Sequence, residues 1–391
     1  MKQRKILFII VLSLLSLTMT SCMSTGTQPA QGWSGVAYHE GVLYTGSMDG
    51  AVVAVNPATR TSEWSYDFGV VSSGGFMSCG QTSAPVAMYG TPVVDGDLVY
   101  AGLYDGRVLA LSSSARRQNL SFPQMREGEW VYPKKGEVGG IVGDLVMSND
   151  AIYVASSDGK VYSLDKVFGD SNWESDILSE KLWKTPVIED DALYVSTFDG
   201  HIYSLSTKDG ALLPWAFKAD IGFASSPAIY QDTIFVGAFD NNLYAIKIGG
   251  NEPLWKFQGG RWFWAAPVIR DGIVYAGCLD GKMYAISAET GELKWECDTH
   301  HPVVSSPVWD GDLLIVADEA GEIFVFDTNA RPENKVMLPM KTISINASVQ
   351  GALCIHDEIV YVHAQDNCLY ALDIARGGIN WKLSLTGEEA S

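Results

Sequence analysis

A strand–turn–strand unit recurs eight times from about residue 32 onward, and this repeat constrains the fold more than any other feature of the chain. Each unit centres on an anchor residue that is followed by glycine or asparagine. The anchors are Asp49, Asp105, Asp158, Asp199, Asp240, Asp280, Ala320 and Asp366. A large apolar or aromatic residue stands five positions before each anchor, and another stands four positions after it. The anchors are 40 to 56 residues apart. Repeats of this length with Asp-Gly turns are typical of β-propellers, in which each repeat forms one blade.

The local chemistry of the unit supports four strands per blade. An Asp-Gly or Asp-Asn pair supplies the positive φ angles that a tight hairpin needs, so it joins two strands. A shorter strand precedes them, as at residues 226–229, and a fourth follows, as at residues 293–295. One blade cannot bury both of its faces, so neighbouring blades must stack around an axis. The sequence therefore predicts an all-β, eight-bladed propeller over residues 32–387, with four antiparallel strands per blade.

A tryptophan recurs on the predicted fourth strand, about fifteen residues after the anchor. We expect these large side chains to fill the wedges between adjacent blades, because the blades must pack face to face. Only the seventh unit lacks a tryptophan there. The residues concerned are Trp64, Trp130 (after a longer insertion), Trp173, Trp215, Trp255, Trp295 and Trp381.

The first 22 residues read as a targeting segment. Basic residues at positions 2, 4 and 5 precede an apolar stretch over residues 6–17, which is too short for an ordinary membrane span. Small residues then lead to Cys22, as in bacterial lipoprotein signals, where the cysteine becomes the lipidated N-terminus. We therefore expect a signal peptide over residues 1–22, lipidation at Cys22 and a flexible tether over residues 23–31. The protein would be extracytoplasmic and lipid-anchored to the cell membrane or outer membrane. The alternative is ordinary secretion with cleavage elsewhere.

Charge and cysteine usage narrow the function classes. A net charge of −19 speaks against nucleic acid as a partner. Five cysteines follow Cys22, an odd number without Cys-x-x-Cys spacing, so we expect no zinc or redox site and mainly isolated buried thiols. A disulfide between Cys354 and Cys368 is the alternative, because both fall in the eighth unit. No acid–base cluster or metal-ligand set emerges, so we expect neither catalytic nor metal-binding residues.

In a propeller the insertions and loops vary and often contain the binding residues, whereas the blades supply the packed scaffold. Residues 65–90, 112–128 and 329–339 depart from the repeat, and the Gly- and Ser-rich run at 72–80 is predicted not to form a strand. The loop before the sixth unit, residues 259–264, is the strongest candidate for a binding site. The matching loop before the seventh unit, residues 298–301, is expected to face it across the axial opening. Together they would form a stacking platform for a planar ligand or a peptide. The alternative is that Phe263 and Trp264 tuck under the loop and seal the channel. The candidate binding residues are Arg261, Trp262, Trp264, His300 and His301.

Residues 274–295 resemble the repeat of pyrroloquinoline-quinone (PQQ) dehydrogenases, which implies the PQQ-like propeller superfamily but no particular activity. The chain lacks the adjacent cysteine pair of many such enzymes, and no calcium-binding carboxylate set can be mapped. With its lipoprotein signal, it is more similar to the propeller lipoproteins of the outer-membrane β-barrel assembly machinery. That resemblance implies a monomeric, non-catalytic scaffold without cofactor, held at the membrane and bound to a protein partner. The alternatives are a PQQ-binding oxidoreductase or quinone sensor, and a receptor for a carbohydrate or other small ligand.

Replacing the predicted anchor tests the targeting interpretation. We expect Cys22→Ala to leave the precursor uncut or to release the protein from membranes. The reason is that each acyl CH₂ buried in lipid contributes about 0.8 kcal/mol, and no spanning helix would compensate for its loss. Membrane fractionation combined with intact-mass measurement provides the readout. Unchanged fractionation with an unchanged mass would contradict the lipoprotein assignment.

Overall fold

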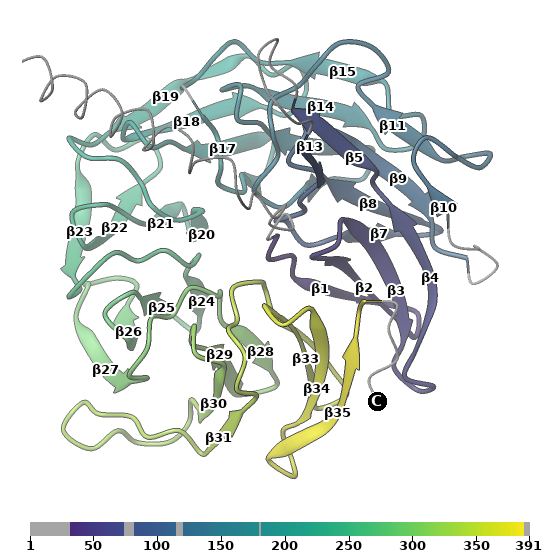
Figure 1. The fold of residues 1–391 in the computed structure, drawn as a ribbon. Coiled ribbons are helices and arrows are strands. Elements are labelled where there is room, and N and C mark those ends of the chain that lie inside the picture. The colour runs from purple at the N-terminus through teal and green to yellow at the C-terminus, as the bar shows by residue number, and fades with distance from the viewer. Residues whose placement is uncertain (1–31, 74–81, 115–119, 180, 387–391) are drawn as a thin grey trace, which may run out of the picture.

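The computed structural model of the 391-residue chain is a closed ring of eight four-stranded blades, as predicted (Figure 1). It describes residues 32–73, 82–114, 120–179 and 181–386. The first strand of each blade lies toward the axis and the fourth lies at the rim, as β20 and β23 show. Within these ranges the ordered elements are all strands, and none is a helix long and apolar enough to cross a membrane. The predicted signal peptide with Cys22 and the predicted tether lie outside the described residues.

The first four blades have the following strands. Blade one contains β1 (Val36–His39), β2 (Val42–Ser47), β3 (Ala51–Asn56) and β4 (Thr61–Asp67). Blade two contains β7 (Val93–Asp95), β8 (Leu98–Gly102), β9 (Val108–Ser112) and β11 (Trp130–Tyr132). Blade three contains β12 (Val146–Met147), β13 (Ala151–Ala155), β14 (Val161–Asp165) and β15 (Ser171–Glu174). Blade four contains β16 (Val187–Glu189), β17 (Ala192–Ser196), β18 (His201–Ser206) and β19 (Leu212–Lys218).

The last four blades repeat the arrangement. Blade five contains β20 (Ala228–Tyr230), β21 (Thr233–Gly237), β22 (Asn242–Lys247) and β23 (Pro253–Gln258). Blade six contains β24 (Val268–Arg270), β25 (Ile273–Cys278), β26 (Lys282–Ser287) and β27 (Leu293–Asp298). Blade seven contains β28 (Val308–Asp310), β29 (Leu313–Ala317), β30 (Glu322–Asp327) and β31 (Lys341–Ser344). Blade eight contains β32 (Cys354–His356), β33 (Ile359–Ala364), β34 (Cys368–Asp373) and β35 (Gly378–Ser384).

The three insertions form additional pairings at or beyond the blade edges. Strands β5 (Val70–Ser73) and β6 (Thr82–Pro85) pair as a hairpin, and β10 (Leu120–Ser121) adds to β4 in parallel. The third insertion runs beside β27, with a parallel bridge between Glu296 and Val336. The prediction that the run at 72–80 is not a strand is wrong for its first two residues, which lie in β5. Pairing with β6 supplies their backbone hydrogen bonds and outweighs a poor intrinsic preference. Residues 74–80 lie outside the described ranges.

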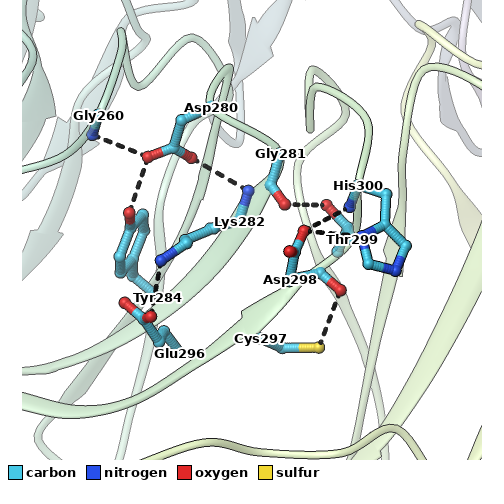
Figure 2. A network of polar contacts seen from close by, with 10 residues as sticks. All are labelled: Gly260, Asp280, Gly281, Lys282, Tyr284, Glu296, Cys297, Asp298, Thr299 and His300. Carbon is cyan, nitrogen blue, oxygen red and sulfur yellow. Dashed lines mark hydrogen bonds and ion pairs between the residues drawn. The ribbon is translucent and has the colours of Figure 1, made fainter.

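The aspartate anchors organise their turns through their carboxylates. In blade six, Asp280 accepts hydrogen bonds from the Tyr284 hydroxyl at 2.7 Å, from the Lys282 amide at 3.0 Å and from the Gly260 amide at 2.7 Å (Figure 2). Burial raises the pKa of Tyr284 most, and the hydrogen bond to the Asp280 carboxylate raises it further. The Gly260 bond fixes the loop that enters blade six against the blade's own hairpin. Asp–Tyr pairs four residues apart make the same contact at Asp158–Tyr162, Asp240–Tyr244 and Asp366–Tyr370.

The recurring tryptophans clamp each blade to the next. For four of these tryptophans, the indole N–H donates to a carbonyl in the turn that follows the third strand of the following blade. The bonds run from Trp130 to Lys166 (3.1 Å), Trp173 to Thr207 (3.0 Å), Trp215 to Gly250 (2.9 Å) and Trp255 to Ala288 (3.0 Å). Trp64, Trp295 and Trp381 are buried, whereas Trp255 is half-buried. The expectation that these side chains fill the wedges between blades is confirmed.

The ring closes by packing of blade eight against blade one, without exchange of strands. In Figure 1 the yellow C-terminal blade lies beside the purple N-terminal blade. A shared apolar cluster includes Leu43, Tyr361 and Trp381. The Asn367 side chain adds two hydrogen bonds, donating to the Asp49 carboxylate at 2.9 Å and accepting from the Met48 amide at 3.0 Å. Closure therefore combines apolar burial with a polar latch between the first and last hairpins.

The four cysteines in the described ranges are free thiols, so Cys354 and Cys368 are not joined. They lie on the first and third strands of blade eight, which are not neighbours in its sheet. Burial raises the pKa of the Cys278 thiol to about 12 and that of Cys354 to about 11, which makes both poor nucleophiles at neutral pH. The expectation of isolated thiols is confirmed for these four; Cys79 lies outside the described residues.

A pair of glycine substitutions isolates the tryptophan clamp. A Cβ on Gly291 would lie 2.7 Å from the Trp255 ring, whereas a Cβ on Gly272 would have no neighbour within 4 Å. Both glycines have positive φ, +71° and +73°, so both alanine variants carry similar backbone strain. We expect Gly291→Ala to lower the Tm distinctly more than Gly272→Ala does. The reason is that overpacking against the indole costs about 1–3 kcal/mol of unfolding free energy. Equal Tm values for the two variants would mean that the indole does not pack on this turn.

Candidate binding site at the axial opening

Four hydrogen bonds around the axis tie blades two to five, and blades six and seven, together at the start of their first strands, and we call this open set the hydrogen-bonded ring. In each bond a backbone N–H donates to the side-chain oxygen of the equivalent residue one blade further on. The bonds run from Thr91 to Asp144 (2.6 Å), Asp144 to Thr185 (2.9 Å), Thr185 to Ser226 (2.9 Å) and Ala266 to Ser306 (3.1 Å). This ring holds the channel walls in a fixed geometry, so the site is formed before any ligand arrives.

Two adjoining cavities occupy the axial channel, and they share Trp33, Trp264, Val304 and Gln350 as walls. One has a volume of about 300 Å³ and is lined by the hydrogen-bonded ring described above and by Lys184. The other has a volume of about 400 Å³ and is lined by Arg261 and Trp262. Both are large enough for a small organic group or the end of a peptide.

The loop predicted as a site is rigid. The Leu279 amide donates to the Trp262 carbonyl at 2.9 Å, and the Cys278 thiol donates to the Arg261 carbonyl at 3.2 Å. With the Gly260–Asp280 bond, these contacts fasten the loop to the hairpin of blade six. Phe263 is fully buried in the core, as the sealing alternative expected, but Trp264 is not sealed beneath the loop and lines the channel.

The structure brings three of the five predicted site residues together. Arg261, Trp262 and Trp264 line the same cavity. His300 and His301 instead line a separate cavity of about 630 Å³ with Met337 and Leu338, beside the third insertion. His300 also pairs with Asp298 at 3.1 Å. The loops that enter blades six and seven therefore do not place these five side chains in one cavity. The insertion after β30 forms a separate groove together with the two histidines.

Half-buried and exposed aromatic rings form an arc around the opening, which we call the aromatic arc. Its members contact one another edge-on or tilted, with ring centroids 4.4–5.6 Å apart. Trp262 and Tyr104 are its most exposed members, at 41% and 48%. One run contains Trp33, Tyr89 and Tyr104, and the other contains Trp183, Phe198, Phe239 and Trp262.

Sequence reasoning missed most of the arc, although a signal exists. Tyr104, Phe198 and Phe239 stand directly before their anchor aspartates, so the repeat places all three on the hairpin face of the ring. An aromatic residue at this turn position lies outside the strands and therefore marks the hairpin face of the ring. Trp33, Tyr89 and Trp183 lie in loops that enter blades and carried no comparable pattern.

Lys184 and Asp144, also missed, are the charged residues of the inner cavity. The Lys184 ammonium lies 3.6 Å from the Trp264 ring centroid, a close cation–π contact. Burial lowers the pKa of Lys184 to about 7. Burial also raises the pKa of Asp144, while its hydrogen bonds from Thr91 and Thr185 act in the opposite direction. Within the described residues, no group of three or more His, Cys, Asp or Glu side chains is placed to hold a metal ion.

Comparisons with known proteins agree with this architecture. The family model described as outer membrane protein assembly factor BamB matches residues 23–128, 124–221 and 213–390. The crystal structure of BamB from Moraxella catarrhalis is similar at 15% identity with a TM-score of 0.62, covering 85% of this chain and 93% of that one. A computationally designed protein, Ika8, is similar at 16% identity with a TM-score of 0.66, covering 86% and 94%. These two likenesses show the fold alone. No curated protein sequence matches the chain.

The lowered pKa of Lys184 predicts a pH-dependent gain from its removal. Between pH about 7 and about 10.4, the unfolded chain holds a proton on this group that the folded chain has lost, so stability falls as pH falls through this window. Lys184→Met removes that penalty. We expect the variant to melt above the wild type at pH 7 and below, with the difference shrinking toward pH 10. Lys256→Met is the control, since Lys256 lies 4.7 Å over the Tyr244 ring on the exposed rim. Identical pH profiles for the two variants would contradict the prediction.

Proposed function

The chain belongs to the BamB family of outer membrane protein assembly factors, and on this premise we propose that it is a membrane-anchored, extracytoplasmic, non-catalytic scaffold in outer-membrane protein assembly. The observation that carries the proposal is the aromatic arc on the axial face. Exposed tryptophan and tyrosine side chains are the residues that most often dominate protein interfaces. Their fixed positions reduce the entropy lost on binding.

The position of the N-terminal segment supports the same face as the functional one. Trp33 lies in the aromatic arc and in both channel cavities, so the chain enters the ring at the axial opening. The chain between Cys22 and Trp33 is short, and each of its residues spans at most about 3.3–3.6 Å. A lipid on Cys22 would therefore stay near Trp33. The arc would therefore operate close to the membrane that holds the anchor.

The channel itself supports a second candidate, the binding of a small ligand. Trp264 presents an aromatic wall to a preformed cavity, and cavities with a few polar groups among apolar walls are typical of small-molecule sites. Carbohydrates and quinones both stack on such walls. In the scaffold proposal no cofactor takes part, and the partner is a protein of the assembly machinery.

Substitutions in the arc test the scaffold. We expect Trp262→Ala combined with Tyr104→Ala to reduce co-purification of the outer-membrane assembly complex from native membranes, because one central aromatic residue can contribute about 2 kcal/mol or more to an interface. Phe168→Ala is the matched control, since Phe168 is 66% exposed in a turn of blade three outside the arc. Circular dichroism and thermal melting verify the fold of each variant. Undiminished co-purification with the folded double variant would rule out the arc as the interface.

A further inference from the structure

Lys184 is a cation without an anionic partner. In the described part of the chain, its ammonium makes no ion pair within 4 Å and no hydrogen bond, only the contact with Trp264. Other lysines of this acidic protein are paired, as Lys282 is with Glu296 at 2.7 Å and Lys382 with Asp366 at 2.8 Å. Holding an unpaired ammonium inside a channel costs free energy unless something else compensates its charge.

Asp144 does not supply that compensation. Its carboxylate accepts the Thr91 amide at 2.6 Å and the Thr185 hydroxyl at 3.5 Å, which ties it into the hydrogen-bonded ring. The equivalent positions in other blades carry Thr, Ser, Ala or Gly, so the carboxylate serves the ring as a hydroxyl does elsewhere. The charged groups facing the two cavities are Asp144 and Lys184 inside, and Arg261 and Glu319 at the mouth.

Two hydroxyl groups line the same cavity as Lys184. The oxygens of Ser226 and Ser306 accept hydrogen bonds from the Thr185 and Ala266 amides, and both line the inner cavity. Neither hydroxyl donates to another described residue, so each O–H is available to a ligand. An ammonium and two hydroxyl donors suit a carboxylate, and the neighbouring tryptophans suit an apolar body.

We propose that the axial channel binds an aromatic or bulky apolar carboxylic acid, with its carboxylate at Lys184, Ser226 and Ser306 and its apolar body between Trp264 and Trp33. The acid is either a free small molecule or the C-terminal end of an extended peptide, since both present the same group. This site lies inside the ring, whereas the proposed protein interface is the arc around its mouth, so one can fail without the other.

The charge on Lys184 gives the site a defined pH dependence. Because its pKa in the free protein is about 7, the carboxylate meets a protonated ammonium below this pH and must recruit a proton above it. We therefore expect affinity to fall by up to about tenfold per pH unit above pH 7, until the raised pKa of the complex is reached. Asp144→Asn should strengthen binding, since it removes the carboxylate that lines the same cavity.

Calorimetric titration of the purified full chain tests the proposal. The probes are hydrocinnamate against hydrocinnamamide, and a short peptide ending in phenylalanine with a free against an amidated C-terminus. We expect the free carboxylate to bind about 10- to 100-fold more tightly than its amide in at least one pair, with Lys184→Met losing the same factor. Binding of the peptide alone would identify a chain end as the ligand, and binding of hydrocinnamate alone a small acid.

A control variant and a check of folding separate loss of the binding site from loss of the fold. Lys256→Met, which removes a rim lysine stacked on Tyr244, is expected to bind as the wild type does. Thermal melting confirms that Lys184→Met is folded before its affinity is compared. Equal affinity for acid and amide, no binding of either pair, unchanged affinity in folded Lys184→Met, or weaker binding by Asp144→Asn would each overturn the proposal.

Discussion

The contact on which the ring most depends is the clamp between a fourth-strand side chain and the turn of the next blade. Trp255 shows it most clearly, because its indole donates to the Ala288 carbonyl and its ring covers Gly291. The same contact survives in blade seven without a tryptophan. Lys341 occupies the register position of the indole, donates to the Ile374 carbonyl at 2.7 Å and lays its methylene stem over Gly377. A lysine can therefore replace the tryptophan at this position, because it also carries a donor on a long apolar stem.

Edge strands are the second constraint on such a ring. Eight outermost strands would each present unpaired backbone groups at the rim, a liability for aggregation. Two insertions reduce it, because β10 pairs with β4 and the stretch around Val336 pairs with β27. Insertions that look like departures from the repeat are therefore also part of how the rim is covered. The groove that contains His300 and His301 is a by-product of this covering.

The axial face differs from the rim because part of its aromatic surface stays exposed, with Tyr104 48% and Trp262 41% accessible. The anchor carboxylates and the hydrogen-bonded ring fix its loops, which leaves Tyr104 and Trp262 free for contacts outside the fold. Rigid loops on a closed ring are a suitable support for recognition without catalysis, since the scaffold needs no moving part. The arc can contact a large surface, whereas the channel beneath it admits only a narrow group.

The sequence alone determined the fold, because the blades repeat nearly the same local chemistry: an Asp-Gly or Asp-Asn turn (Ala-Gly in blade seven), alternating strands and a clamp residue. Lys341 shows its limit, since nothing in the repeat marks a lysine as a substitute for tryptophan. For the site, the sequence identified Arg261, Trp262 and Trp264 as loop residues near the axis and grouped His300 and His301 with them, whereas in the structure the two histidines line a separate cavity. Only the tertiary structure placed Lys184 against Trp264, because they come from loops of different blades, about 80 residues apart, that meet at the axis. Local periodicity encodes which elements form, whereas the meeting of side chains across the channel depends on closure of the whole ring.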